Sequence, residues 1–392
     1  MSLRFLMRFV SVFALLTLVI AWVPAHADSK VGAQIRTDYV IEGSNDDTIT
    51  SNGVSMKTND ETTAKYFQFK VAKLKIGGSL DDNVKYFATV DFRGSWSSDA
   101  VFGSSDQTSV LPDLAMEYKL IDNLTLTVGQ FFLNIGGVEG QMSGLDVYRW
   151  SYIEDYGYGE VAYGQMPGLA LDYTFANQRI ELLAFNNASN IKNQSTPGMG
   201  IVFFGDFLDG MIKPILSYHN LPYPKQVAKG PESSLTADVI KKKIDYYAVG
   251  SEFVLLDKQL ILHGDYLKNI YKDWQGVVGK NDSKQSIVFE ARYNHAGNAS
   301  IQPVIKYDTG KHRVQDVDYW KYNTYNIALE YFPRMNVDKT DKKTQPKIFL
   351  SYASCQDENQ VAYTSTTSDR GSRAVGKKIR TSELRLGFSL NI

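Results

Sequence analysis

The sequence predicts an all-β chain that closes into a 16-stranded antiparallel transmembrane β-barrel, and three observations support this fold class. Apolar and polar residues alternate at every second position through most of the chain, whereas helical periodicity is weak. Short and long connections take turns between the predicted strands. The chain ends on LRLGFSLNI, an alternating strand with no polar tail. These patterns are typical of a sheet that closes on itself in lipid.

Residues 1–27 have the pattern of a secretory signal peptide. Arg4 and Arg8 precede an apolar run over 9–22, and Ala25-His26-Ala27 supplies small residues for a cleavage site. A membrane anchor is the alternative, but the run is shorter than the roughly 20 residues that span a bilayer. We therefore expect an exported chain whose residues 28–392 form a single barrel.

The composition limits the classes of partner. The 392 residues include 42 basic and 43 acidic side chains, and Arg4 and Arg8 are lost with the leader. A slightly acidic mature chain argues against nucleic acid or anionic headgroups as the main partner. Cys355 is the single cysteine, so a disulfide framework is not expected. The aromatic content is high, with 24 Tyr and 20 Phe.

Strands are predicted wherever the period of two persists, as in Val31, Ala33 and Ile35 of the first. The apolar face changes parity within 64–76, which predicts a β-bulge. Strands 198–206 and 243–254 alternate poorly. The predicted strands are 30–42, 64–76, 84–94, 111–120, 124–132, 167–175, 179–187, 198–206, 211–219, 243–254, 259–269, 284–294, 299–309, 322–332, 346–354 and 379–392.

The connections decide between a soluble sandwich and a membrane barrel. Most of those after even-numbered strands are short, such as IDN and ANQ. Those after odd-numbered strands are longer and polar, and they are predicted at 43–63, 95–110, 133–166, 188–197, 220–242, 270–283, 310–321 and 355–378. Outer-membrane barrels have short periplasmic turns and long external loops, so this rhythm favours such a barrel.

Aromatic residues fall where two membrane interfaces would lie. Tyr39, Tyr218 and Tyr352 are near the predicted outer strand ends, and Phe175 and Tyr331 are near the inner ends. Such girdles mark the two interfaces of a transmembrane barrel.

The last strand is expected to close the barrel against the first. Leu384, Leu386 and Phe388 would face acyl chains, while Arg385 would face the lumen. The terminal alternation also resembles the sorting signal read by the outer-membrane assembly machinery, with Ile392 where such signals usually carry Phe.

Two stretches carry a family resemblance. FQFKVAKLKIGGSLDDNVKYFATVDFRG (67–94) and LPDLAMEYKLIDNLTLTVGQFFLNIGG (111–137) resemble porins of the phosphate-selective O/P type. The resemblance covers roughly the first third of the chain, and it implies a trimeric diffusion pore of 16 strands. It also implies that the third long loop, 133–166, folds into the lumen as a pore constriction.

Charged side chains are the candidate functional residues, because a pore sorts solutes by its width and its charges. Strand parity places nine bases and nine acids on the inner wall. The wall candidates chosen from them are Arg36, Lys85, Asp91, Arg93, Glu117, Glu290, Arg292, Lys306 and Arg385. The loop candidates are Glu139, Asp146, Arg149, Glu154, Asp155 and Glu160, of which all but one are acidic. Porins of the phosphate-selective type prefer anions, so the resemblance implies an excess of basic residues along the pore. The charges predicted for this wall and loop do not show such an excess.

Catalysis is not expected. His263 and Asp265 share one strand face, but the other histidines are scattered, and no nucleophile elbow or metal-binding spacing appears. No cofactor or metal ion is therefore expected, and the chain is predicted not to be an enzyme.

The sequence thus predicts an outer-membrane porin of a Gram-negative bacterium that passes small hydrophilic solutes and ions by passive diffusion. Its expected partners are outer-membrane lipid and lipopolysaccharide, the assembly machinery and two further copies in a homotrimer, and no nucleic acid. A substrate-selective anion or phosphate channel is one alternative. A surface adhesin or receptor that uses the external loops is the other, but a barrel of this size favours a pore.

Overall fold

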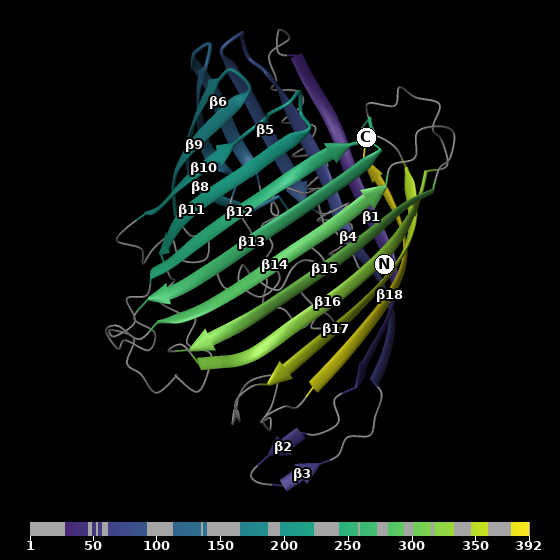
Figure 1. Cartoon of the computed structure of the whole chain (residues 1–392). Coiled ribbons are helices and arrows are strands. Elements are labelled where there is room, and N and C mark those ends of the chain that lie inside the picture. The colour runs from purple at the N-terminus through teal and green to yellow at the C-terminus, as the bar shows by residue number, and fades with distance from the viewer. Residues whose placement is uncertain are drawn as a thin grey trace, which may run out of the picture.

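The chain forms one closed barrel of 16 antiparallel strands, seen from the side in Figure 1. The computed structural model describes residues 28–45, 49–51, 54–56, 62–91, 113–134, 136–138, 165–186, 197–222, 243–257, 259–272, 281–293, 301–314, 317–332, 346–359 and 378–391. The predicted fold class is confirmed, and the described residues are strands and their turns, without helices.

The strands follow one another around the barrel in chain order. They are β1 (Asp28–Asn45), β4 (Thr62–Ser79), β5 (Val84–Asp91), β6 (Asp113–Ile121), β7 (Leu124–Phe132), β8 (Gln165–Phe175), β9 (Gln178–Phe185), β10 (Gly198–Phe204), β11 (Ile212–Pro222), β12 (Lys243–Leu255), β13 (Leu260–Lys272), β14 (Asp282–Tyr293), β15 (Ile301–Val314), β16 (Val317–Tyr331), β17 (Lys347–Asn359) and β18 (Lys378–Asn391). Two short strands, β2 (Ile49–Ser51) and β3 (Val54–Met56), form a separate hairpin between β1 and β4.

The last strand closes the barrel, as predicted. β18 pairs with β1 in a continuous register that runs from Gln34 opposite Asn391 to Asn45 opposite Arg380. Because each of the 16 barrel strands has two neighbours, the barrel sheet has no free edge, which is the condition for a sheet in hydrocarbon.

The two faces of the strands differ as the alternation predicts. On β18 the side chains of Leu384, Leu386 and Phe388 are exposed on the outer surface, whereas Glu383 and Arg385 between them are buried. The same alternation runs along β15 and β16, where Ile305 and Ile327 are exposed and Lys306 and Asn326 are buried. The outer surface is therefore apolar, and the inner surface carries the charges.

The bulge predicted in 64–76 is confirmed. Arg36 of β1 pairs with Val71, but the next residue, Thr37, pairs with Phe69, so Lys70 is an extra residue on β4. A bulge reverses which residues face which side. Phe67 faces outward on one side of the bulge, and Lys73 and Lys75 face inward beyond it, opposite Gln34 and Gly32.

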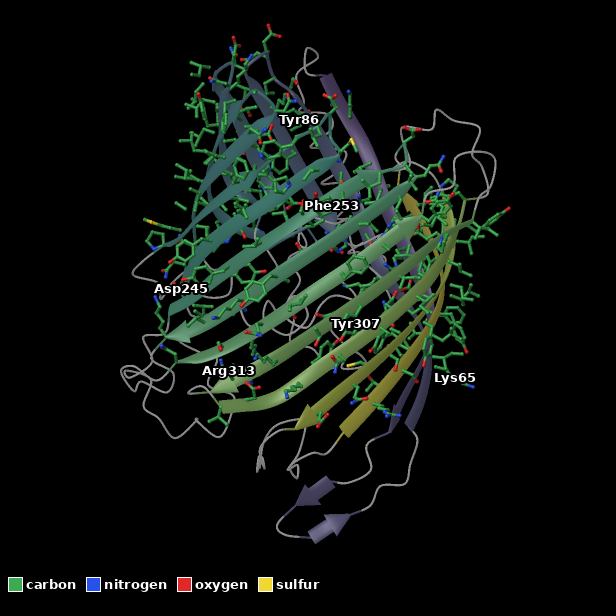
Figure 2. All side chains as sticks on the ribbon, viewed as in Figure 1. Lys65, Tyr86, Asp245, Phe253, Tyr307 and Arg313 are labelled. Carbon is green, nitrogen blue, oxygen red and sulfur yellow. The ribbon has the colours of Figure 1, made fainter. Side chains whose placement is uncertain are left out.

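Aromatic rings gather toward the strand ends on the outer surface. Near the ends of β11 and β12 that a long connection joins, Tyr218 packs on Tyr247 with ring centroids 5.1 Å apart, and on β15 and β16 Tyr307 packs on Tyr325 at 4.9 Å. Figure 2 shows Lys65, Asp245 and Arg313 toward this end of the barrel, and Tyr86 and Phe253 toward the opposite end.

One predicted loop is wrong. Residues 310–321 were expected to form a long loop, but β15 and β16 continue to Val314 and Val317 as a paired hairpin. Arg313 Nε lies 3.0 Å from Asp318 Oδ1 across the end of this hairpin. Where strands extend beyond the apolar belt, both of their faces are polar and the alternation of apolar and polar residues is lost. A prediction based on that alternation therefore misses the paired ends of β15 and β16.

Candidate functional site: the barrel lumen

The predicted wall residues that the structure describes lie on the inner face of the barrel. Arg36, Asp91, Glu290, Lys306 and Arg385 are all buried there. Lys85 of β5 stands opposite Glu117 of β6, and Glu117 lines an inner cavity. Arg292 lies on the face of β14 that carries Glu290 and contacts it. Arg93 lies outside the described residues.

The charges on β13, β14, β16 and β17 form one chain of ion pairs. His263 Nδ1 is 3.9 Å from Glu290 Oε1, and Arg292 Nη2 is 3.3 Å from the same oxygen. Glu330 Oε1 then receives Arg292 Nη1 at 3.4 Å and Lys347 Nζ at 2.9 Å. Each acid in this chain is matched by a base, so this part of the wall presents little net charge to the lumen.

A second cluster lies across the seam where the barrel closes. Arg36 donates Nε and Nη2 to the two carboxylate oxygens of Asp38 at 3.0 and 3.1 Å. From β18, Arg385 Nη1 is 3.8 Å from Asp38, and its Nη2 donates to Glu383 Oε2 at 2.8 Å. The Arg36 guanidinium also lies 4.6 Å from the ring centroid of Phe349. Arg36 and Arg385 therefore stabilise the closure as well as line the lumen.

The chain that follows β7 turns into the barrel and contacts three other strands. Asn134 Nδ2 donates to Glu181 Oε2 of β9 at 2.6 Å, and Ser217 Oγ of β11 donates to Gly136 O at 3.0 Å. The N–H of Val138 donates to Asp265 Oδ1 of β13 at 2.8 Å. We call the described residues 133–134 and 136–138 the inward segment. Leu133 and Val138 are buried in it.

The inward segment packs on an apolar cluster inside the lumen. Leu133 and Val138 share this cluster with inner-face residues of β9 to β14, which include Leu183, Phe185, Val202, Ile215, Ile244, Tyr246, Ala248, Leu267 and Val288. The poor alternation of 198–206 and 243–254 now has a reason. These strands are apolar on both faces, because one face is on the outer surface and the other packs within the lumen.

Glycines let the inward segment approach the wall. A Cβ at Gly137 would lie 2.3 Å from Asp265 Oδ1, and a Cβ at Gly250, the neighbour of Asp265 on β12, would lie 1.8 Å from it. Any side chain larger than hydrogen at either position would push the carboxylate away from the Val138 N–H.

Open space in the lumen lies against β4 to β9. A cavity of about 510 Å³ is lined there by Lys30, Lys75, Phe87, Asp113, Glu117, Phe131, Asn134, Asp172, Arg179 and Glu181, among others. We call it the vestibule. By contrast, the inner-face side chains of β14 to β18 are mostly buried. The vestibule therefore lies beside β1 and β4 to β9.

Lys73 and Lys75 are inner-wall bases that the strand parity of the sequence missed, and Lys30 of β1, which shares the parity of Arg36, also faces inward. The sequence predicts a bulge within 64–76, which implies that the inward-facing parity changes along this strand. The residues beyond the bulge can be assigned to the inner face only once the bulge is located at Lys70. Lys284, Lys347, Glu252 and Glu383 also face inward.

Glu139, Asp146, Arg149, Glu154, Asp155 and Glu160 lie outside the described residues, as does the predicted signal peptide 1–27.

His263 and Asp265 do lie on one face of β13, and both are buried. Their partners are structural, because His263 faces Glu290 and Asp265 holds the Val138 N–H. Within the described residues, no three His, Cys, Asp or Glu side chains are grouped closely enough to hold a metal ion.

A search of the described residues finds no helix with the length and apolar character needed to cross a membrane. No family model matches the chain, and no curated protein sequence matches it either.

Solved structures do match. The anion-selective porin from Comamonas acidovorans is similar with a TM-score of 0.61 at 9% identity, over 94% of this chain and 100% of that one. The outer membrane channel DcaP of Acinetobacter baumannii gives 0.60 at 14% identity, over 94% and 98%. The trimer form of OmpT, an outer membrane protein of Vibrio cholerae, gives 0.57 at 10% identity, over 93% and 99%. The chain therefore has the fold of outer-membrane porins along nearly its whole length.

Proposed function

We propose that the protein is an outer-membrane porin that lets small hydrophilic solutes and ions diffuse passively through its lumen. One observation carries this proposal: a closed barrel of 16 strands has an apolar outer surface and a charged inner surface beside an open cavity. Barrels of about this strand number enclose an aqueous channel, whereas barrels of about eight strands are filled by side chains.

The location in the outer membrane of a Gram-negative bacterium follows from the same proposal. The predicted leader 1–27 would export the chain, and the assembly machinery would read the C-terminal strand. The pairing of β18 with β1 supports this role, because the last strand completes the sheet. The outer surface would then contact membrane lipid and lipopolysaccharide.

We further propose that the loop 133–166 forms the constriction. The hydrogen bonds of Asn134, Gly136 and Val138 to three separate strands support it, since they hold the start of this loop inside the barrel. The rest of the loop would add its acidic residues, Glu139, Asp146, Glu154, Asp155 and Glu160, and the single base Arg149.

Weak ion selectivity is expected from the paired wall charges. The second candidate is the anion or phosphate channel that the O/P-type porin resemblance implies. Lys30, Lys75 and Arg179 in the vestibule would support this candidate, whereas Asp113, Glu117, Asp172 and Glu181 line the same cavity. No described feature favours the adhesin alternative.

Assembly as a homotrimer is also a proposal. It rests on the porin fold and on OmpT, whose structure is described as a trimer form. Cross-linking of the detergent-solubilised protein, followed by mass measurement, would test it.

The function is tested by reconstituting the purified protein in a planar lipid bilayer. We expect stepwise conductance in potassium chloride and a small reversal potential across a salt gradient. Strong anion preference would favour the second candidate, and absence of conductance from folded protein would overturn the porin proposal.

A further inference from the structure

Three lysines follow one another across the outer face of β13 to β16. Lys268 of β13 stands opposite Gln285 of β14, Gln285 stands opposite Lys311 of β15, and Lys311 stands opposite Lys321 of β16. The four residues therefore occupy one level on four neighbouring strands, which lie side by side in Figure 1. They lie toward the end of the barrel that carries the long connection between β11 and β12. We call these four residues the basic row.

The basic row faces away from the lumen. Its neighbours along the chain, which include Leu267, Ser286 and Tyr322, point inward and are buried. By contrast, Lys321 is exposed and the other two lysines are partly exposed. The row is therefore open to whatever surrounds the barrel at this level.

The row lies beyond the apolar belt. Tyr307 and Tyr325 pack together on the outer face, and each is four residues from Lys311 or Lys321 on its own strand. Four residues extend about 13 Å at roughly 3.3 Å each, or about 10 Å along the normal for a strand tilted by about 40°. Because tyrosines mark the membrane interface, the lysines lie at the level of lipid headgroups, where a charge on the outer face costs little.

Bases outnumber acids on the outer face around the row, although the whole chain is slightly acidic. The described bases there are Lys268, Lys272, Lys311, Arg313 and Lys321, and the described acids are Asp245, Asp318 and Glu358. Lys272 contacts Asp245. Asp318 Oδ1 lies 3.0 Å from Arg313 Nε and 4.0 Å from Lys311 Nζ. The local excess of positive charge attracts an anionic headgroup.

Two lysines of the row have no acid to neutralise them. Among the described residues, neither Lys268 nor Lys321 takes part in an ion pair, although Glu358 of β17 stands opposite Lys321. Lys311 and Lys321 also stand directly opposite each other, and like charges in that relation destabilise a sheet. A phosphate held between these two lysines would relieve their repulsion.

The row has room for two anionic groups on one headgroup. Lys311 and Lys321 are one strand interval apart, whereas Lys268 is two intervals from Lys311, about 10 Å at roughly 4.8 Å each. Gln285 lies in that interval and adds an uncharged donor. On the other side of Lys268, at the same level, Tyr247 packs on Tyr218. These tyrosine rings offer an apolar face and a hydroxyl group, which suits a sugar ring.

We infer that the basic row binds the headgroup of a glycolipid that carries two phosphate groups, one held by Lys311 and Lys321 and the other by Lys268. The acyl chains would lie on the apolar surface below, where Ile287 and Ile305 are exposed. The lipid A part of lipopolysaccharide has this chemistry, with two phosphates on a disaccharide. This inference deepens the proposed outer-membrane function and rests on it, because such a lipid reaches the row only from the outer leaflet.

The experiment measures lipid binding to the purified full-length barrel in neutral detergent by native mass spectrometry. The three probes are lipid A, monophosphoryl lipid A with one phosphate, and phosphatidylglycerol with one phosphate and no sugar. We expect lipid A to bind at a concentration at least tenfold lower than either other probe. Equal binding of all three probes overturns the inference, and so does equal binding of lipid A and its monophosphoryl form.

Two substitutions test the row itself. Lys311→Gln with Lys321→Gln should weaken binding of lipid A at least tenfold. The matched control, Lys65→Gln with Arg380→Gln, removes the same charge from exposed bases on β4 and β18 and should bind like the wild type. Equal loss of binding in both double variants would show that only the net charge matters and would overturn the site.

A near-isosteric change at the centre of the row is the sharper test. Gln285→Glu places a negative charge between Lys268 and Lys311 and should weaken lipid A binding by a similar factor. Gln285→Met keeps the length of the side chain without a charge and should retain most of the binding. Wild-type affinity in Gln285→Glu would overturn the proposed position of the headgroup.

The site and the porin function fail separately. Heat-modified gel mobility establishes that each variant is folded, and conductance in potassium chloride reports the pore. A conducting channel that binds lipid A no better than phosphatidylglycerol overturns the glycolipid site and leaves the porin function intact. A folded barrel that binds lipid A tightly but does not conduct overturns the porin function and supports the site.

Discussion

The backbone N–H of Val138 donates a hydrogen bond of 2.8 Å to Oδ1 of Asp265, a residue 127 positions further along the chain. This bond joins the start of the proposed constriction to the far wall of the barrel. Asp265 is buried, so the bond is protected from competing water.

Removal of this acceptor should loosen the proposed constriction. In Asp265→Ala the Val138 N–H loses its partner, and a hydrogen bond to a charged group is worth about 1.5–3 kcal/mol. We expect a higher mean single-channel conductance and larger current fluctuations, recorded in planar bilayers. Asp265→Asn retains an acceptor oxygen and should lie closer to the wild type; identical traces for wild type and Asp265→Ala would argue against the tether.

Crowding the same carboxylate should have a similar effect without removing it. In Gly250→Ala the new Cβ would lie 1.8 Å from Asp265 Oδ1, so the carboxylate must move. Overpacking of this kind costs about 1–3 kcal/mol, and we expect a lower midpoint of urea unfolding together with altered conductance. Gly264→Ala is the matched control on the next strand, because its Cβ meets only Val288 O at an ordinary 3.6 Å.

A charge on the outer face of the last strand should destabilise the barrel. Leu386 is 53% exposed on the apolar surface, so Leu386→Arg should cost about 2–4 kcal/mol near the bilayer midplane. Unfolding by denaturant in lipid vesicles measures this cost. Leu386→Met should change little, and equal stability of the Arg and Met variants would mean that this face does not meet lipid.

Arg385, the inward-facing neighbour of Leu386, should be less tolerant of substitution than its place on the inner face alone suggests. Arg385→Leu adds an apolar side chain inside the lumen, but it also removes the partner of Glu383 and one partner of Asp38. A buried acid left without its partner costs about 1–3 kcal/mol, and the same unfolding measurement detects it. Arg385→Leu with Glu383→Leu should recover part of the loss; no recovery would separate Arg385 from this ion pair.

The acidic residues of the proposed constriction should set a mild cation preference. Replacement of Glu154 by Gln together with Asp155 by Asn removes two negative charges and should move the reversal potential toward the anion side. A salt gradient across the bilayer gives this value directly. Unchanged selectivity would remove these two residues from the pore.

All 16 barrel strands were predictable from the sequence, because one face of each meets the outer surface and the other meets the lumen. The boundaries were less certain. At β15 and β16 the strands run past the apolar belt, and there the pairing depends on backbone hydrogen bonds and on contacts such as Arg313 with Asp318. Side-chain periodicity does not report such pairing.

The candidate site was predictable only in part. Arg36, Glu290 and Arg385 were assigned to the inner wall, but their pairing into neutral clusters depends on which strands are neighbours. Lys75 was missed, because one extra residue at Lys70 reverses the face of everything beyond it.

The sequence by itself determined the closed barrel, since alternation and loop lengths are local properties that each strand carries along its own length. Only the tertiary structure decided that β9 to β14 pack their inner apolar residues against the inward segment, and that open space remains beside β4 to β9. The physical reason is that the contacts between Val138 and Asp265, or Asn134 and Glu181, join residues far apart in the chain. Their proximity exists only after the sheet has closed.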